Sequence, residues 1–173
     1  MKVLALVRGL PGHPSHPPMT DGAIGAYTAA TVLVAVGAAG VAEEELAKGW
    51  WITLLVGLGF GALAAVTGLA DWVTITRGTA LRRTATTHLI VMVIANALFG
   101  VAAIVGYGGY SDGEIGTPEL VLALCGFAAL TVGGWIGGSI VFVHGMRVLE
   151  LPEEPAARAI APGGAEKERA EGG

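Results

Sequence analysis

Charged side chains are scarce in this 173-residue chain, since Asp, Glu, Lys and Arg together make up 14% of it. Soluble domains usually carry about 25%. Water-soluble surfaces are built from such groups, so the chain lacks the side chains needed to cover a globule of its size. The chain has 10 basic against 14 acidic residues, which gives no support to nucleic acid as a partner. The composition excludes an ordinary soluble domain.

Cysteine is nearly absent as well. Cys125 stands alone, which excludes a disulfide within these residues and a thiolate metal cage. The beginning of the chain also lacks the apolar run of a signal peptide. The run from Val3 to Val7 has five residues before Arg8 interrupts it, whereas a signal peptide needs about 7 to 15. We expect no cleavage there.

Long uncharged stretches are what the sequence has instead. A helix needs about 20 apolar residues to cross roughly 30 Å of hydrocarbon, and four stretches have that length. A soluble bundle would show a polar stripe with helical spacing, but the fourth stretch is uncharged on every face. We predict an all-α integral membrane protein, a four-transmembrane-helix bundle, with spans at about 22–42, 51–70, 89–106 and 120–143.

The segments that flank this domain, residues 21–150, differ from it in composition. Residues 1–20 contain the Pro-rich run RGLPGHPSHPPMTD, in which prolines oppose a regular helix, so we expect an extended cytoplasmic arm. Residues 151–173 are rich in Pro, Gly, Ala and Glu. They have too little apolar content to offset the entropy of ordering, so we expect a disordered cytoplasmic tail.

The basic residues predict the orientation. With four spans both termini lie on one side, and nine Lys and Arg fall there, whereas the other side has only Lys48. Short cytoplasmic loops carry the excess of basic residues. We therefore expect a multi-pass protein of the plasma membrane with both termini cytoplasmic. The nine residues are Lys2, Arg8, Arg77, Arg82, Arg83, Arg147, Arg158, Lys167 and Arg169.

This topology gathers all four histidines and two aspartates at the cytoplasmic ends of the helices. Ionisable groups at the ends of a span avoid the free-energy cost of burying a charge at the centre of the bilayer. The simpler interpretation, which we favour, is that these are interfacial residues, with Asp21 capping the first helix. The alternative is a site, since imidazole and carboxylate suit zinc, iron or copper. The candidate metal ligands are His13, His16, Asp21, Asp71, His88 and His144. The candidate ligands of a haem, which a pair of histidines could bind, are His16, His88 and His144.

Asn96 and the glycines are the remaining signals inside the spans. Asn96 is the one strongly polar side chain deep in a span, and we expect it to form an interhelical hydrogen bond. In lipid, close approach of helices through glycine is a main source of association. We expect glycine faces to pack against another span, or against a second copy or a membrane-complex partner; room for a flat cofactor is the less common alternative. The glycines concerned are Gly57, Gly61, Gly133 and Gly137.

Four segments also carry a resemblance: GLPGHPSHPPMTDGAIGAYTAATVL, ATGLADW, THLIVMVIANALF and GGWIGGSIVFVHGMRV. In this order they resemble a family of bacterial predicted membrane proteins called domain of unknown function 2231, over about residues 9–149. The resemblance implies a four-helix integral membrane domain without an assigned activity, and its polar pattern matches the six candidate ligands above. Ser139 departs from that pattern, because many relatives carry His or Glu there, which weakens a metal site.

Several functions compete on these grounds. We favour a small non-enzymatic membrane component or accessory subunit, because the glycine faces suit packing and deep ionisable groups are lacking. The alternative is a haem- or metal-binding redox protein that uses the histidine cluster. Transport has less support, because a midplane site needs broken helices with a polar lining. A hydrolase has least, since neither Ser15 nor Ser139 lies in a Gly-x-Ser-x-Gly elbow.

Overall fold

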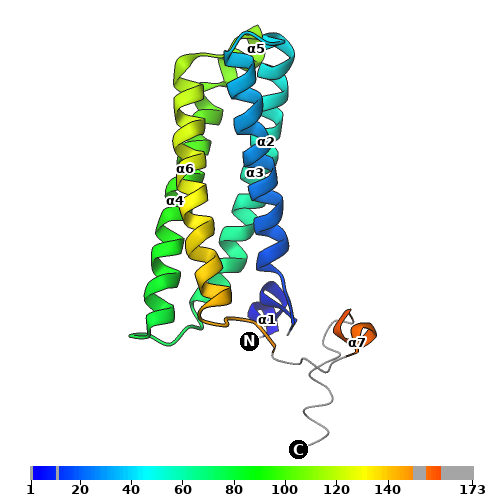
Figure 1. The fold of residues 1–173 in the computed structure, drawn as a ribbon, viewed down its shortest axis with the longest axis vertical. Coiled ribbons are helices and arrows are strands. Elements are labelled where there is room, and N and C mark those ends of the chain that lie inside the picture. Colours follow the sequence, from blue (N-terminus) through cyan, green and yellow to red (C-terminus); the bar gives the residue numbers. More distant parts are fainter. Residues whose placement is uncertain (1, 11, 150–154, 161–173) are drawn as a thin grey trace, which may run out of the picture.

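Four long helices form the frame of the molecule (Figure 1). A computed structural model describes residues 2–10, 12–149 and 155–160. Each of the four helices is long and apolar enough to cross a membrane, so the predicted all-α bundle with four spans is confirmed. The helices are α2 (His16–Ala38), α3 (Glu43–Trp72), α4 (Ala80–Val105) and α6 (Thr117–Phe142).

Short elements complete the described chain: α1 (Lys2–Arg8), β1 (Gly9–Leu10), β2 (His13–Pro14), α5 (Tyr107–Asp112) and α7 (Ala156–Ile160). The two strands pair antiparallel, with Gly9 opposite Pro14. The expectation of an extended arm over residues 1–20 is thus wrong in conformation, since it contains α1, this hairpin and the start of α2. Most of the expected tail, residues 151–173, lies outside the described residues, and residues 155–160 contain α7.

Two helices begin earlier than their apolar runs indicate. Pro17 and Pro18 occupy the first turn of α2, where a missing N–H costs nothing and the fixed φ suits a helix. Asp21 therefore lies inside α2 and does not cap it, contrary to expectation. Helix α4 begins after Thr79, whose hydroxyl accepts a hydrogen bond from the Arg82 amide at 3.1 Å. His88 consequently lies two turns into α4 rather than at its start.

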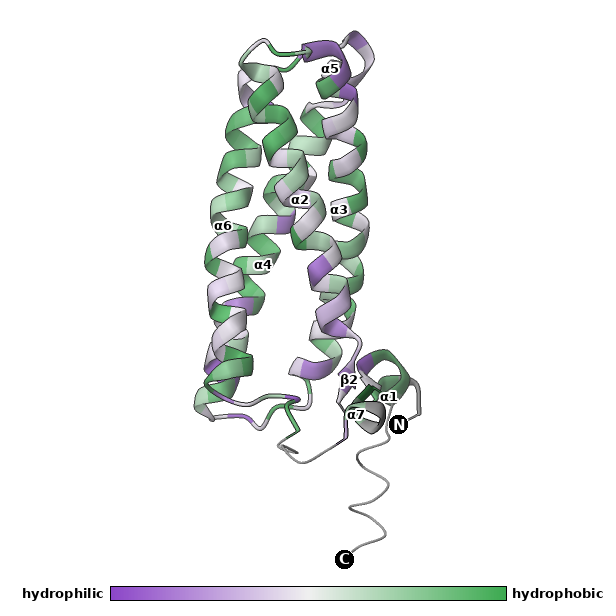
Figure 2. Cartoon of the chain, turned by 45° about the vertical axis from the view of Figure 1, so that its right-hand side comes forward, coloured by the Kyte–Doolittle hydropathy of each residue, from purple (hydrophilic) through white to green (hydrophobic). Residues whose placement is uncertain are grey.

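Hydrophobic residues cover the lengths of the four long helices, and hydrophilic residues gather toward the two ends of the bundle (Figure 2). Large apolar side chains point outward, such as Trp135, which is 83% exposed, and Phe142, which is 89% exposed. In water such surfaces would be costly, but lipid tails solvate them. At one end, which we call the histidine end, α2 and α4 begin and α3 and α6 finish.

The bundle consists of two similar helical hairpins, α2–α3 and α4–α6. Within each hairpin the helices pack extensively, and the contact of α2 with α6 is matched by that of α4 with α3. Equivalent residues take equivalent places: Tyr27 stands eleven positions after His16, and Phe99 stands eleven positions after His88. Each hairpin thus makes the same contacts with the other, which indicates that an approximate two-fold axis along the bundle relates the two hairpins.

The tightest part of the core lies between the two hairpins. The rings of Tyr27 and Phe99 are fully buried and stacked, with centroids 4.0 Å apart and planes 6° from parallel. Behind each ring is a glycine of its own hairpin: a Cβ on Gly57 would lie 2.6 Å from the Tyr27 ring, and one on Gly126 3.1 Å from the Phe99 ring. The absence of a side chain at these two positions lets the aromatic pair fit.

Four glycines were expected to pack against another span or against a partner. In the structure they contact side chains of the same chain. Gly57 and Gly61 meet Tyr27 and Asn96 of α2 and α4, and the α6 glycines meet Met92 and His88 of α4. Those α6 residues are Gly133 and Gly137, and they pack against the third span rather than the second. These four glycines therefore serve packing within the bundle.

Replacing Gly57 tests this packing against a control on the same helix. We expect Gly57→Val to lower the unfolding temperature in detergent, with a loss of about 1–3 kcal/mol from overpacking, because the stacked Tyr27 ring has no space to move. Gly59→Val should cost little, since, apart from the adjoining residues and backbone of its own helix, nothing lies within 4 Å of the position that a Cβ would take there. Thermal unfolding followed by circular dichroism measures both. Equal losses in the two variants would contradict the packing argument.

Candidate ligand-binding cavity

A cavity of about 630 Å³ lies between the two hairpins, near the histidine end. All four long helices contribute to its wall, which is mostly apolar. Binding pockets for small molecules and cofactors usually measure about 300–1,000 Å³ and are lined mainly by apolar groups with a few polar ones. The polar residues here include His16, Asp71, His88, Asn96 and Arg147. The cavity has the size and the composition of a ligand site.

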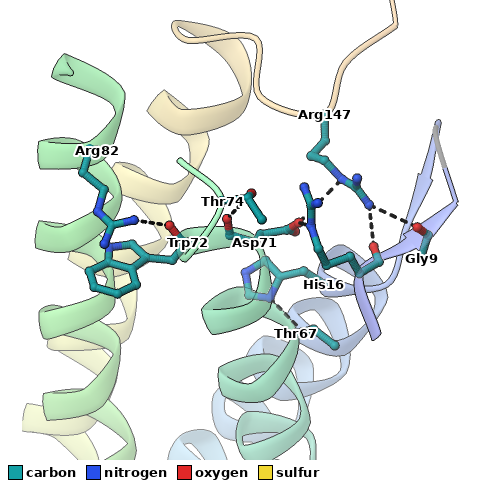
Figure 3. Close-up of polar contacts among 9 residues, drawn as sticks. Gly9, His16, Thr67, Asp71, Trp72, Thr74, Arg82 and Arg147 are labelled. Carbon is teal, nitrogen blue, oxygen red and sulfur yellow. Dashed lines mark hydrogen bonds and ion pairs between the residues drawn. The ribbon is translucent and has the colours of Figure 1, made fainter. Parts of the chain in front are cut away.

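His16 lies on the wall that α2 and α3 form. Its Nδ1 is 3.0 Å from the carbonyl oxygen of Ala64 and 3.2 Å from the Thr67 hydroxyl; Figure 3 shows the ring beside Thr67. A carbonyl oxygen only accepts, so Nδ1 carries the proton and Nε2 keeps its lone pair. The ring rests on Gly68, where a Cβ would lie 2.8 Å from the His16 Cε1 atom. Backbone and glycine together fix this imidazole.

His88 repeats this arrangement on the wall that α4 and α6 form. Its Nδ1 donates to the carbonyl oxygen of Gly133 at 2.9 Å, and its ring rests on Gly137, where a Cβ would lie 3.0 Å from Cε1. In each hairpin the accepting carbonyl belongs to the residue four positions before the glycine. Neither Nε2 is among the fully buried polar atoms without a partner in the described chain. Two equivalent imidazoles thus line one cavity, and in the neutral tautomer that donates from Nδ1 each keeps the lone pair of its Nε2.

Asn96 lies on the cavity wall farther from the histidine end. Its Oδ1 accepts a hydrogen bond from the Tyr27 hydroxyl at 2.8 Å, and its Nδ2 donates to the Met92 carbonyl at 2.8 Å. The predicted interhelical hydrogen bond of Asn96 is therefore confirmed, with α2 as the partner helix. Because Tyr27 also stacks on Phe99, the inner end of the cavity rests on the tightest part of the core.

A cluster of charges lies beside the cavity at the histidine end, where α3 and α6 finish; we call this region the mouth of the cavity (Figure 3). Arg8 Nε donates to Asp71 Oδ1 at 2.7 Å, and Arg147 Nε lies 3.8 Å from the same oxygen. Arg147 also donates to the backbone carbonyls of Arg8 and Gly9. Asp71 is only 6% exposed, and a buried carboxylate needs such partners. These contacts fasten the N-terminal segment and the end of α6 to the end of α3.

Trp72 closes the other side of the mouth. The guanidinium of Arg82 lies 3.4 Å from the centre of the Trp72 ring and donates to the Trp72 backbone carbonyl. The indole Nε1 donates to the Thr86 hydroxyl at 3.0 Å. Cation–π attraction and these hydrogen bonds link the end of α3 to the beginning of α4. The mouth is therefore built from side chains of both hairpins that hydrogen bonds, ion pairs and a cation–π contact connect.

The six candidate ligands do not meet at one point. Within the described residues, no three His, Cys, Asp or Glu side chains are grouped so that they can hold a metal ion. His16, Asp71 and His88 line the cavity, but the other three do not. Asp21 is exposed on α2, His144 shares a hydrogen bond with the Thr84 hydroxyl at 3.2 Å, and His13 has a buried Nδ1 without a partner in the described part.

Sequence reasoning missed Arg8 and Arg147 as parts of the site. Both were counted only as basic residues that predict orientation. Arg147 contacts backbone atoms 138 and 139 positions away, and no local pattern reports such a contact. Gly134 and Gly138 also line the cavity, and room for a ligand beside these two α6 glycines stays a prediction.

The buried Asp71 carboxylate should stabilise the histidine end. We expect Asp71→Ala to lower stability by about 2 kcal/mol, less than the roughly 3–5 kcal/mol of fully buried pairs because both arginines are partly exposed. Trypsin should also cleave after Arg8 faster. Limited proteolysis and thermal unfolding in detergent measure the two effects. Glu44→Ala, which removes the exposed Glu44–Lys48 pair at the opposite end, is the control, and an equal effect there would contradict the assignment.

Comparison with known proteins gives one match. The family model described as predicted membrane protein (DUF2231) matches residues 12–150, which include the whole cavity. No curated protein and no solved structure matches the chain. The match spans far more than half of the sequence and agrees with the four candidate spans. The chain therefore belongs to the DUF2231 family of predicted membrane proteins.

Proposed function

We propose that this protein binds a haem between His16 and His88 and acts as a small electron-carrying component of a bacterial plasma membrane. One observation carries the proposal: two imidazoles in equivalent places of the two hairpins line one cavity, each with Nδ1 bound to a backbone carbonyl. Histidine ligands of metals commonly have their other ring nitrogen held in this way, which sets the tautomer and the orientation of the ring.

Haem fits the donor set better than a bare metal ion. Structural zinc and similar ions need about four protein ligands, whereas the described residues offer no group of three. A haem brings four equatorial nitrogens of its own and asks the protein only for axial ligands. The cavity is mostly apolar and is lined by glycines on α3 and α6, which leaves room for a flat group.

His16 and His88 would hold the haem, and the chemistry that it would supply is electron transfer. With an imidazole on each side of the iron, no position would remain for oxygen or substrate, and the burial of the site and the hydrogen bonds of the two histidines would set the potential. The sequence favoured an accessory component because of glycine faces, but those glycines pack inside the chain. The cavity therefore gives the redox alternative the stronger support, and a small non-enzymatic component is compatible with it.

The histidine substitutions test the proposal. We expect the natural chain, purified in detergent from cells supplied with iron and a haem precursor, to show a Soret band of a low-spin haem with two imidazole ligands. His16→Ala and His88→Ala should each lower the bound haem by more than about tenfold. His144→Ala is the matched control and should retain the band, because His144 does not line the cavity. A colourless natural protein from such cells would overturn the proposal.

We place both termini, and hence the cavity mouth, on the cytoplasmic side. The support is the excess of basic residues that the sequence assigns to the side of the termini, nine against the single Lys48. Residues 1–20 and 151–173 would then flank the membrane domain of residues 21–150 in the cytoplasm. Alkaline phosphatase is active only outside the cytoplasm, so fusions after Arg77 and after Gly173 should be inactive and one after Asp112 active. The reverse pattern would refute this orientation.

A further inference from the structure

Among the described residues, the charges at the cavity mouth do not balance. Arg8 and Arg147 share one carboxylate, that of Asp71, and both approach the same oxygen, Oδ1. Two guanidinium groups and one carboxylate leave one positive charge in excess. Arg8, at 2.7 Å, forms the direct hydrogen bond, whereas Arg147, at 3.8 Å, lies beyond hydrogen-bond distance. The excess charge therefore belongs to Arg147.

Apart from the longer contact with Asp71, Arg147 meets no carboxylate in the part of the chain that the structure describes. Its terminal nitrogen donates to the carbonyl oxygens of Arg8 and Gly9, which are dipoles without net charge. A guanidinium has five N–H donors, so donors remain for a further partner. Its side chain is only 22% exposed, and a charge that is largely removed from water is costly without a close partner of opposite charge. Within the described chain, the carboxylate that pairs with Arg147 is that of Asp71, which Arg8 already binds.

The backbone places Arg147 on the cavity wall. After α6 the chain turns through Gly145, with φ of 63°, and Arg147 itself has φ of 64°. A residue other than glycine adopts this left-handed conformation at a cost, and it persists where the surroundings fix it. The turn brings Arg147 back across the mouth to Asp71, and Arg147 lines the cavity together with Met146 and Val148.

We infer that Arg147 binds a carboxylate of the ligand in this cavity, which orients the ligand with its acidic edge at the mouth. For the haem of the proposed function, on which this inference rests, the carboxylates are the two propionates. Guanidinium matches a carboxylate in charge and in planar geometry and can bind it through two parallel hydrogen bonds. The propionates would thus point toward the histidine end, and the apolar edge of the porphyrin would lie toward Asn96.

Iron protoporphyrin IX and its dimethyl ester separate the charge of the ligand from its shape. The full chain in detergent is freed of haem and titrated with each compound, and binding is followed by the Soret band. We expect the natural chain to bind haem about tenfold or more tightly than the ester, the usual worth of a hydrogen bond to a charged group. Arg147→Gln should lower the affinity for haem about tenfold and leave that for the ester unchanged. Arg83→Gln, whose arginine binds the Gly78 carbonyl away from the cavity, should change neither.

The outcomes distinguish this inference from the proposed function. If the natural chain binds neither compound, the haem proposal itself fails. If it binds both equally, or if Arg147→Gln weakens both alike, Arg147 only fastens the N-terminal segment and the inference fails while the haem proposal stands. If Arg147→Gln loses both compounds completely, Arg147→Lys decides, because it retains the charge. That variant must still prefer haem to the ester, and the loss of this preference overturns the inference.

Discussion

Close approach of the two hairpins at one level of the bundle is the constraint on which the other features depend. Lipid provides no hydrophobic drive between helices, so association rests on packing that small residues permit. Gly57 and Gly126 permit it here, because each receives the ring of an aromatic residue that stacks on the ring from the other hairpin. That contact fills the centre of the bundle. Toward the histidine end no comparable pair of rings joins the hairpins in the described chain, and the space between them is the cavity.

Much of the fold follows from the sequence because its physical cause is local. The length of an uncharged run reports the thickness of hydrocarbon that it can cross, and four such runs correspond to the four long helices. The residues at which the helices begin were harder to predict from the sequence. Prolines at 17 and 18 were interpreted as helix breakers, whereas in the first turn of α2 they favour a helix. The difference lies in position within the helix, which composition does not reveal.

The site was predictable only in part, for a different reason. His16 and His88 were among the expected residues because both fall at one end of the predicted bundle. What sets them apart from His13 and His144 is a backbone carbonyl and a glycine on a neighbouring helix. Backbone atoms are the same in every sequence, so no pattern of side chains reports them. Arg147 was missed for a similar reason, since its place depends on the turn after α6 and on a contact with a distant segment.

The repeated hairpin has a consequence for the symmetry of the cavity. Three residues after the glycine beneath each imidazole, the first hairpin carries Asp71 and the second carries Ile140, and both residues line the wall. Two copies of a single hairpin would have to carry the same residue twice. Because the two halves are joined in one polypeptide, they can differ at this position, where the cavity wall is therefore charged on the side of the first hairpin and apolar on the side of the second.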